Sequence, residues 1–122
     1  CFLNLFALIS YLISVKSEEV VLFCAGSDGK PAREDLLCAG AIAQGLSLSA
    51  IGPLELSARA REEMVYPEGL GPEELGEALV RTDHGRHLVS LGFAKDVRYC
   101  GRTDTHPHLA LYKDGSLRLR AQ

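Results

Sequence analysis

A chain of 122 residues has room for one domain with a modest hydrophobic core. Hydrophobic residues make up 47% and charged residues 24%, which is typical of a globular protein and excludes a largely disordered one. The net charge of −3 has the wrong sign for a nucleic-acid-binding face, so we expect no nucleic-acid partner.

The four cysteines form no C-x-x-C pair, which argues against a zinc ribbon or a thioredoxin-type motif. Two of them end apolar runs, where a free cysteine acts as a small buried hydrophobe, so we expect a reducing, cytoplasmic compartment, with a structural disulfide as the open alternative. The apolar run at residues 1–14 is shorter than the roughly 20 residues of a membrane span and lacks the positive start of a signal peptide. We therefore expect no membrane contact. Because the sequence begins at Cys1 and not at methionine, we also expect that a longer protein has been cut here.

The first half of the chain predicts a helix, a strand, a turn and a second helix. Apolar residues recur at helical spacing over residues 2–14, which predicts a buried helix. The run VVLFC at residues 20–24 is typical of a strand covered on both faces, as in a parallel sheet. Residues 25–30 (AGSDGK) predict a turn, and Pro31 suits the start of a helix that Gly45 would end. A stripe of small residues on this helix predicts close packing against a sheet: Ala39, Gly40 and Ala43.

The second half predicts helices at residues 53–66, 72–80 and 83–92, and a strand at 96–100 (DVRYC). The clearest local pattern is the alternation around Asp114 and Gly115, which predicts a two-stranded hairpin within residues 108–120. The alternation of helices and strands indicates an α/β fold, a layered α/β/α sandwich around a mostly parallel sheet.

The strand, turn and helix at residues 20–46 form the best candidate site, because α/β sheets bind ligands beyond the carboxyl ends of their strands. Loop amides and a helix N-terminus favour an anion, although most such turns bind nothing. The turn fails as a P-loop, since Gly26 and Gly29 are too close together. It also fits a cysteine-phosphatase loop poorly, because Lys30 replaces the arginine. Cys24 is therefore a weaker candidate as nucleophile than as a packing residue.

Two further groups of residues offer metal chemistry. Glu34 and Asp35 lie in the first turn of the predicted helix, where a carboxylate either holds Mg²⁺ or only complements the helix dipole. The pairs His106 with His108 and His84 with His87 have spacings that suit a metal, but neither pair has an evident third ligand. Surface histidines are the preferred interpretation.

Several segments, in order, resemble the 2-phosphosulfolactate phosphatase family. The most specific is VLFCAGSDGKPAREDLLCAGAIA, which matches the family's strand ending in Cys-Ala-Gly, its glycine loop, its acidic pair and its Ala-Gly helix. FLNLFALISYL with Asn4, GRHLVSLGFAKDVRYCGRTD and HPHLALYKDGSLRL match less specific family elements. The family's amino-terminal half, with its Asp-x-x-Arg-Ala-Thr and Thr-Asn-Gly-Thr elements, is absent. The chain therefore resembles the carboxyl-terminal half, and we expect the sandwich to be incomplete.

The resemblance implies a Mg²⁺-dependent phosphatase that converts 2-phosphosulfolactate to sulfolactate and phosphate, a step of coenzyme M biosynthesis. It implies that Asp35, Glu34 and Cys24 belong to the catalytic site and that Asp35 or Glu34 holds the metal, since adjacent helix residues point about 100° apart and do not easily face one ion. The substrate would be bound by Asn4, Gly26, Gly29, Lys30 and Arg33.

The alternative is a non-catalytic α/β module that binds an anion or a partner. We expect a homodimer or the missing half as the partner, since half of an α/β domain would be weakly stable or self-associating.

Overall fold

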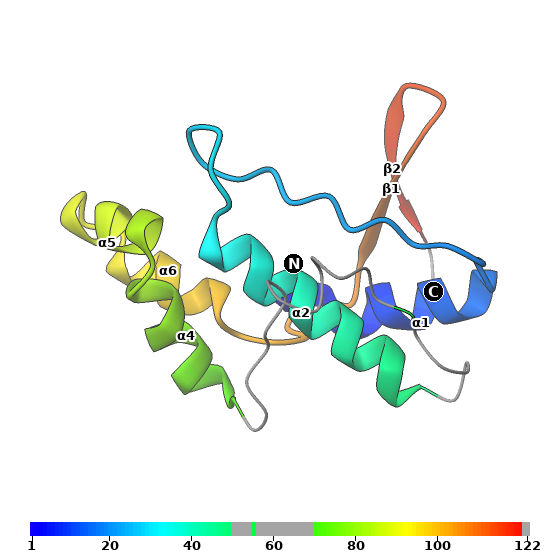
Figure 1. Ribbon diagram of the computed structural model, residues 1–122, viewed down its shortest axis with the longest axis horizontal. Helices are drawn as coiled ribbons and strands as arrows, with labels where there is room; N and C mark the ends of the chain where they lie inside the picture. The colour runs from blue at the N-terminus through cyan, green and yellow to red at the C-terminus, as the bar shows by residue number, and fades with distance from the viewer. Residues whose placement is uncertain (50–54, 56–69, 121–122) are drawn as a thin grey trace.

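The computed structural model describes residues 1–49, 55 and 70–120. In this part of the chain the elements are η1 (Phe2–Asn4), α1 (Leu5–Val15), α2 (Arg33–Leu48), α4 (Pro72–Val80), α5 (Asp83–Ser90), α6 (Ala94–Cys100), β1 (Leu109–Lys113) and β2 (Ser116–Arg120). Figure 1 shows α4, α5 and α6 gathered at one end, and α1 with the hairpin at the other. The predicted helix at residues 53–66 lies outside the described residues.

Helix α2 is the centre of the fold, because most of its residues from Leu37 to Leu46 are buried. Its small residues are buried as the sequence predicts, with Ala39 at 4% and Ala43 at 5% exposure. The sheet on which they were expected to pack is not found among the described residues, whose only sheet is the hairpin. The chain is therefore a mixture of helices and a small antiparallel sheet, consistent with the α/β class but without a parallel-sheet sandwich in the described part.

The helix predicted at residues 2–14 is confirmed as η1 followed by α1, but its burial is not. No residue of α1 is fully buried, and Phe6 is 71% exposed. Gly45 does not end α2, which continues to Leu48. A Cβ atom at Gly45 would lie 2.2 Å from Cδ1 of Ile9, so this glycine lets α1 pack closely against α2. The helix-stop interpretation was wrong because the glycine serves packing between helices.

The hydrophobic core joins η1, α2, α4 and α6 around Leu75, which is fully buried. Its other buried members are Phe2, Leu37, Ala41, Leu79 and Val97. Helix α4 begins as predicted with Pro72 in its first turn, and α5 is capped by Thr82, whose Oγ1 accepts a hydrogen bond from the Gly85 amide at 2.9 Å. These local signals explain why both helices were predicted at nearly their observed bounds.

The strand predicted at residues 96–100 is wrong, because these residues form most of α6. Val97 is the one buried residue of α6, and Arg98 pairs with Glu77 of α4 at 2.7 Å. Gly101 follows directly, and a Cβ there would lie 2.4 Å from the Gly76 nitrogen, so α6 ends in close contact with α4. Packing between helices thus overrides the β-propensity of Val97 and Tyr99.

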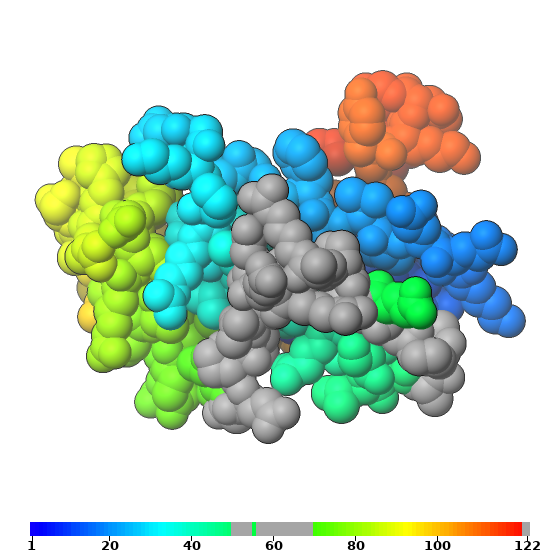
Figure 2. Space-filling model, in the orientation of Figure 1, coloured from blue at the N-terminus to red at the C-terminus, as the bar shows by residue number. Residues whose placement is uncertain are grey.

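The hairpin is confirmed in antiparallel register, with Leu109 opposite Arg120 and Lys113 opposite Ser116. Asp114 and Gly115 both have positive φ, 51° and 77°, as a tight hairpin turn requires. The hairpin stands away from the helices in Figures 1 and 2. Its last strand returns to α1, where the Arg120 guanidinium carbon lies 4.6 Å from the centroid of the Tyr11 ring.

Candidate active site at the start of helix α2

The loop before α2 contains a tight turn at Ser27–Lys30. The Ser27 amide donates to the Lys30 carbonyl, and the Lys30 amide donates back to the Ser27 carbonyl, both at 2.9 Å. Asp28 and Gly29 between them have φ values of 50° and 73°. Two successive positive φ values are the signature of a type I′ turn, for which an Asp-Gly pair is well suited. The turn predicted from the glycines is therefore present, and Gly29 serves its backbone conformation.

A carboxylate of α2 ties this turn to the helix. The Gly26 amide donates a hydrogen bond to Oδ2 of Asp35, in the first turn of α2, at 2.8 Å. Gly26 has φ of 74°, and a Cβ there would lie 2.4 Å from the Lys30 carbonyl oxygen. Only glycine therefore fits against the Lys30 carbonyl at this position. The side chain of Asp35 holds the loop in place across this gap.

These hydrogen bonds use some of the loop N–H groups that the sequence analysis predicts to bind an anion. The amides of Gly26, Ser27 and Lys30 donate to protein oxygens. In the described part of the chain, the amides of Ala25, Asp28 and Gly29 have no protein acceptor. An anion at this loop would therefore depend strongly on side-chain charges.

Lys30 and Arg33 supply such charges. Both side chains belong to exposed residues at the start of α2, and neither forms an ion pair with another described residue. Both positive charges precede the two carboxylates in sequence and remain available to a ligand. Asn4, in contrast, is used internally: its side-chain amide donates to the His108 carbonyl at 3.0 Å, and its Oδ1 accepts from the Cys1 amino group at 3.2 Å.

The carboxylates offer a small ligand set for a cation. Glu34 and Asp35 are half-buried, and Oδ1 of Asp35 has no hydrogen-bond donor within the described ranges. Among those residues, no three or more His, Cys, Asp or Glu side chains are grouped so as to hold a metal. Mg²⁺ commonly takes one or two protein carboxylates and completes its shell with water and substrate phosphate. Glu34 and Asp35 are therefore carboxylates of the kind that Mg²⁺ uses, but within the described residues they belong to no closed metal cage.

Two half-buried thiols lie near Asp35. Neither Cys24 nor Cys38 forms a disulfide with another described cysteine. Burial raises the pKa of the Cys38 thiol above its ordinary value of 9.0, the Cys1 amino group opposes this, and the charges of Asp35 and Cys24 raise it further. Cys38 is thus kept protonated at neutral pH and is a packing residue. Its position three residues after Asp35 places both side chains on one helix face.

The histidine pairs do not form metal sites in the described part of the chain. The rings of His84 and His87 lie with centroids 6.4 Å apart. Nδ1 of His106 lies 3.0 Å from the Thr105 hydroxyl, and its ring meets Tyr99 edge-on at 6.2 Å. All four histidines are exposed, which agrees with the surface interpretation.

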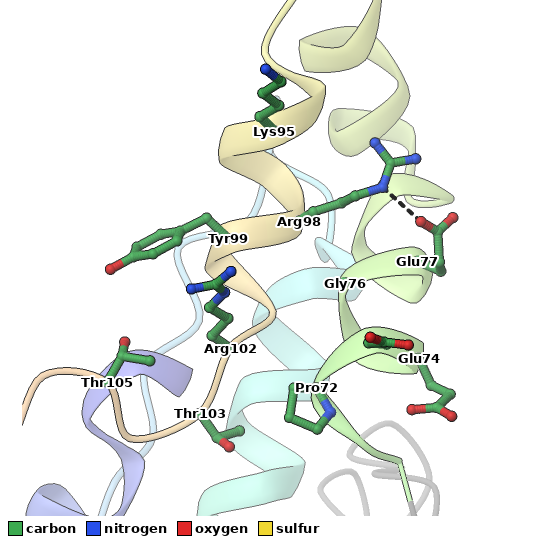
Figure 3. A pocket seen from close by; sticks show the side chains of 11 residues that line it. Pro72, Glu74, Gly76, Glu77, Lys95, Arg98, Tyr99, Arg102, Thr103 and Thr105 are labelled. Carbon is green, nitrogen blue, oxygen red and sulfur yellow. Dashed lines mark hydrogen bonds and ion pairs between the residues drawn. The ribbon is translucent and has the colours of Figure 1, made fainter.

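A groove between α4 and α6 was not predicted from the sequence. Figure 3 shows Arg98 reaching from α6 to Glu77 of α4, with Tyr99 and Arg102 farther along. The Arg102 guanidinium carbon lies 5.2 Å from the Tyr99 ring centroid. The groove is lined by charged residues of both signs: Glu73, Glu74, Glu77, Lys95, Arg98 and Arg102. Because the acidic wall offsets the basic one, the groove is a poorer phosphate site than the loop before α2.

No helix within the described residues is long and apolar enough to cross a membrane.

Residues 1–115 match the family model described as 2-phosphosulpholactate phosphatase. The chain is 38% identical over 103 residues to a probable 2-phosphosulfolactate phosphatase of Thermotoga petrophila, covering 84% of this chain and 42% of that protein. It is 35% identical over 102 residues to one of Deinococcus radiodurans, with coverage of 84% and 41%. A 2-phosphosulfolactate phosphatase of Methanothermobacter thermautotrophicus is 32% identical over 103 residues, with coverage of 84% and 42%.

The chain thus spans less than half the length of these relatives, and the match runs along nearly all of its own length. Such a match confirms the resemblance that rests on the Cys-Ala-Gly loop, the acidic pair and the Ala-Gly helix. By sequence, this chain belongs to the 2-phosphosulpholactate phosphatase family.

Proposed function

We propose that this chain carries part of the active site of a Mg²⁺-dependent phosphatase that hydrolyses 2-phosphosulfolactate. In this reaction water adds to phosphorus, the ester P–O bond breaks, and sulfolactate and inorganic phosphate leave. The observation that carries the proposal is the match of residues 1–115 to a family whose relatives bear this activity in their names. The loop at the start of α2 supplies a chemically suitable place for it.

The substrate carries phosphate, carboxylate and sulfonate groups, so its site needs several positive charges. Lys30 and Arg33 are exposed, unpaired within the described residues and adjacent to the helix N-terminus. We assign them to the substrate's anionic groups. Gly26 and Gly29 shape the turn that presents Lys30, and Asp35 fixes that turn.

The metal would be held by Glu34 and by the oxygen of Asp35 that the Gly26 amide leaves free. When bound, Mg²⁺ neutralises charge on the phosphoryl oxygens. Asp35 would therefore have two tasks, orienting the loop through Oδ2 and contributing Oδ1 to the ion. We further propose a cytoplasmic location, supported by cysteines without disulfides among the described residues, and a place in coenzyme M biosynthesis, supported by the family resemblance.

Release of phosphate from 2-phosphosulfolactate tests this function. The assay uses the full polypeptide in which these residues occur, with Mg²⁺ and with the metal chelated. We expect activity that chelation abolishes and that Lys30→Ala and Arg33→Ala each lower by about tenfold or more, since each removes a charge that meets the substrate. The matched control is Lys95→Ala, which removes a cation in the α4–α6 groove and should leave activity unchanged. Metal-independent activity, or none at all, contradicts the proposal.

A non-catalytic module is the second candidate, favoured by the small number of possible metal ligands in the described residues. Calorimetric titration of the chain with inorganic phosphate separates the two. Phosphate binding that requires Lys30 and Arg33, in a full polypeptide without phosphate release, favours the module.

A further inference from the structure

A small pocket lies between α1, the base of the hairpin and the pre-β1 segment, which comprises residues 104–108. The cavity has a volume of about 420 Å³, within the range of about 300–1,000 Å³ that is usual for small-molecule sites. Its lining is mostly apolar and includes Phe6, Tyr11, Pro107 and Leu109. Figure 1 shows the base of the hairpin beside α1, where these residues meet.

The pre-β1 segment forms a fixed wall of this pocket, because hydrogen bonds tie it to the start of the chain. The Asp104 amide donates to the Phe2 carbonyl at 3.1 Å, and the His106 amide donates to the Leu3 carbonyl at 2.8 Å. The Phe6 amide donates in turn to Oδ1 of Asp104 at 2.6 Å. A wall that is held in place before a ligand arrives lowers the cost of binding.

Two charged side chains of opposite sign line the pocket, and neither pairs with the other. The guanidinium carbon of Arg120 lies 4.6 Å from the centroid of the Tyr11 ring, and Arg120 forms no ion pair with another described residue. Oδ1 of Asp104 accepts from the Phe6 amide, whereas Oδ2 has no donor within the described ranges. One apolar cavity therefore offers both a cation and a carboxylate oxygen to a ligand.

We propose that this pocket binds a free α-amino acid with a large apolar or aromatic side chain. The carboxylate of the ligand pairs with Arg120, and its ammonium group pairs with Asp104. Its side chain lies against Phe6 and Tyr11, since aromatic rings pack well on one another in offset or edge-on contacts. The pocket shares no residue with the loop before α2, so the proposal does not depend on the proposed hydrolysis.

Other ligand classes leave part of the pocket unsatisfied. Inorganic phosphate or a phosphate ester would be attracted by Arg120 and repelled by Asp104, and it has no apolar surface to cover Phe6. An amine or a carboxylate with an apolar body would pair with only one of the two charges. The end of a peptide likewise carries only one charge beside its side chain. Only a free amino acid of this kind meets both charges and the apolar walls together.

Calorimetric titration of the full polypeptide in which these residues occur tests the proposal with L-phenylalanine as the probe. We expect a Kd of about 1 mM or lower. Three analogues each lack one feature of the probe: phenylpropionate lacks the ammonium group, phenethylamine lacks the carboxylate, and free glycine lacks the apolar side chain. Each analogue should bind at least about tenfold more weakly. In nuclear magnetic resonance spectra, L-phenylalanine should shift the amide signals of Ser10 and Leu109 and not that of Gly26.

Two variants remove the two charges separately. Arg120→Gln and Asp104→Asn should each weaken binding of L-phenylalanine by about tenfold or more. The asparagine oxygen still accepts from the Phe6 amide, so the wall of the pocket is kept. Arg120→Gln should hardly change the binding of phenethylamine, and Asp104→Asn should hardly change that of phenylpropionate, because each analogue lacks the group that the variant no longer meets. The control is Arg118→Gln, a cation on the same face of β2 that does not line the pocket.

Four results would overturn the proposal. The first is no binding of L-phenylalanine up to about 10 mM. The second is phenylpropionate binding as tightly as L-phenylalanine, which would reduce the pocket to a site for apolar carboxylates. The third is equal weakening by Arg118→Gln, which would indicate a general effect of positive charge. The fourth is a set of amide shifts confined to the loop before α2, where Lys30 and Arg33 would then hold the carboxylate.

Discussion

The hydrogen bond from Gly26 to Asp35 allows a quantitative test of how the loop is held. Asp35→Ala removes the acceptor and leaves the half-buried Gly26 amide without its partner. A hydrogen bond to a charged group makes a net contribution of about 1.5–3 kcal/mol to stability. Because this bond is partly exposed, we expect it to contribute about 1–2 kcal/mol. Asp35→Ala also loses the favourable charge in the first turn of α2, about 0.3–1 kcal/mol.

Glu34→Ala is the matched control for this experiment. Glu34 lies in the same first turn of α2, has similar burial and accepts no hydrogen bond from another described residue. Both variants therefore lose the helix-dipole contribution, and the difference between them isolates the loop bond at about 1–2 kcal/mol. Urea unfolding followed by far-ultraviolet circular dichroism measures the free energy of unfolding. The Gly26 amide should exchange faster in Asp35→Ala only. Equal stability of the two variants, with unchanged exchange at Gly26, would refute the reasoning.

Asp35→Asn separates the two tasks proposed for this residue. Its side-chain oxygen still accepts from the Gly26 amide, so most of the stability should return. The lost charge should raise the Mg²⁺ concentration needed for half-maximal phosphate release. If Asp35 only positions the loop, Asp35→Asn should recover both the stability that Asp35→Ala loses and the Mg²⁺ concentration that the unchanged protein needs for half-maximal phosphate release.

Two further predictions address packing and pH. Gly101→Ala should destabilise the chain by about 1–3 kcal/mol in urea unfolding. The new Cβ would lie 2.4 Å from the Gly76 backbone nitrogen, whereas exposed Cys100→Ala beside it should have little effect. Because the pKa of the Cys38 thiol is raised on folding, its contribution to stability is present below its ordinary value of 9.0 and is lost as pH rises through the folded value. Stability should fall from about pH 8 to about pH 10 more steeply in the unchanged chain than in Cys38→Ala. Identical slopes would contradict this.

Local signals explain the elements that the sequence predicted correctly. Pro72 and the acidic residues after it start α4, Thr82 caps α5, and Asp114 with Gly115 forms the hairpin turn. Each signal acts within a few residues of its position and needs no distant partner. The candidate loop was predictable for the same reason, because Asp-Gly specifies its turn locally.

The errors lie where distant contacts decide the structure. Val97 and Tyr99 favour a strand by propensity, but α6 forms because α4 offers Leu75 and Glu77 as neighbours. Gly45 resembles a helix stop until Ile9 of α1 is known to pack on it. The bond from Gly26 to Asp35 joins residues nine apart across a turn, and no periodic pattern predicts it.

The use of the loop amides changes how the candidate site should hold an anion. A turn rich in glycine predicts several N–H groups open to an anion, yet the amides of Gly26, Ser27 and Lys30 already donate to protein oxygens. What remains is a turn fixed before any ligand arrives, with the cations of Lys30 and Arg33 exposed beside it. Preorganisation of this kind lowers the cost of binding, because the loop need not be ordered by the substrate. Attraction to exposed cations is screened by salt over about 8–10 Å, whereas buried amide contacts are much less sensitive. Substrate affinity at this loop should therefore depend on ionic strength. That dependence should disappear when Lys30 and Arg33 are replaced by alanine, and it should remain when Gly29 is replaced.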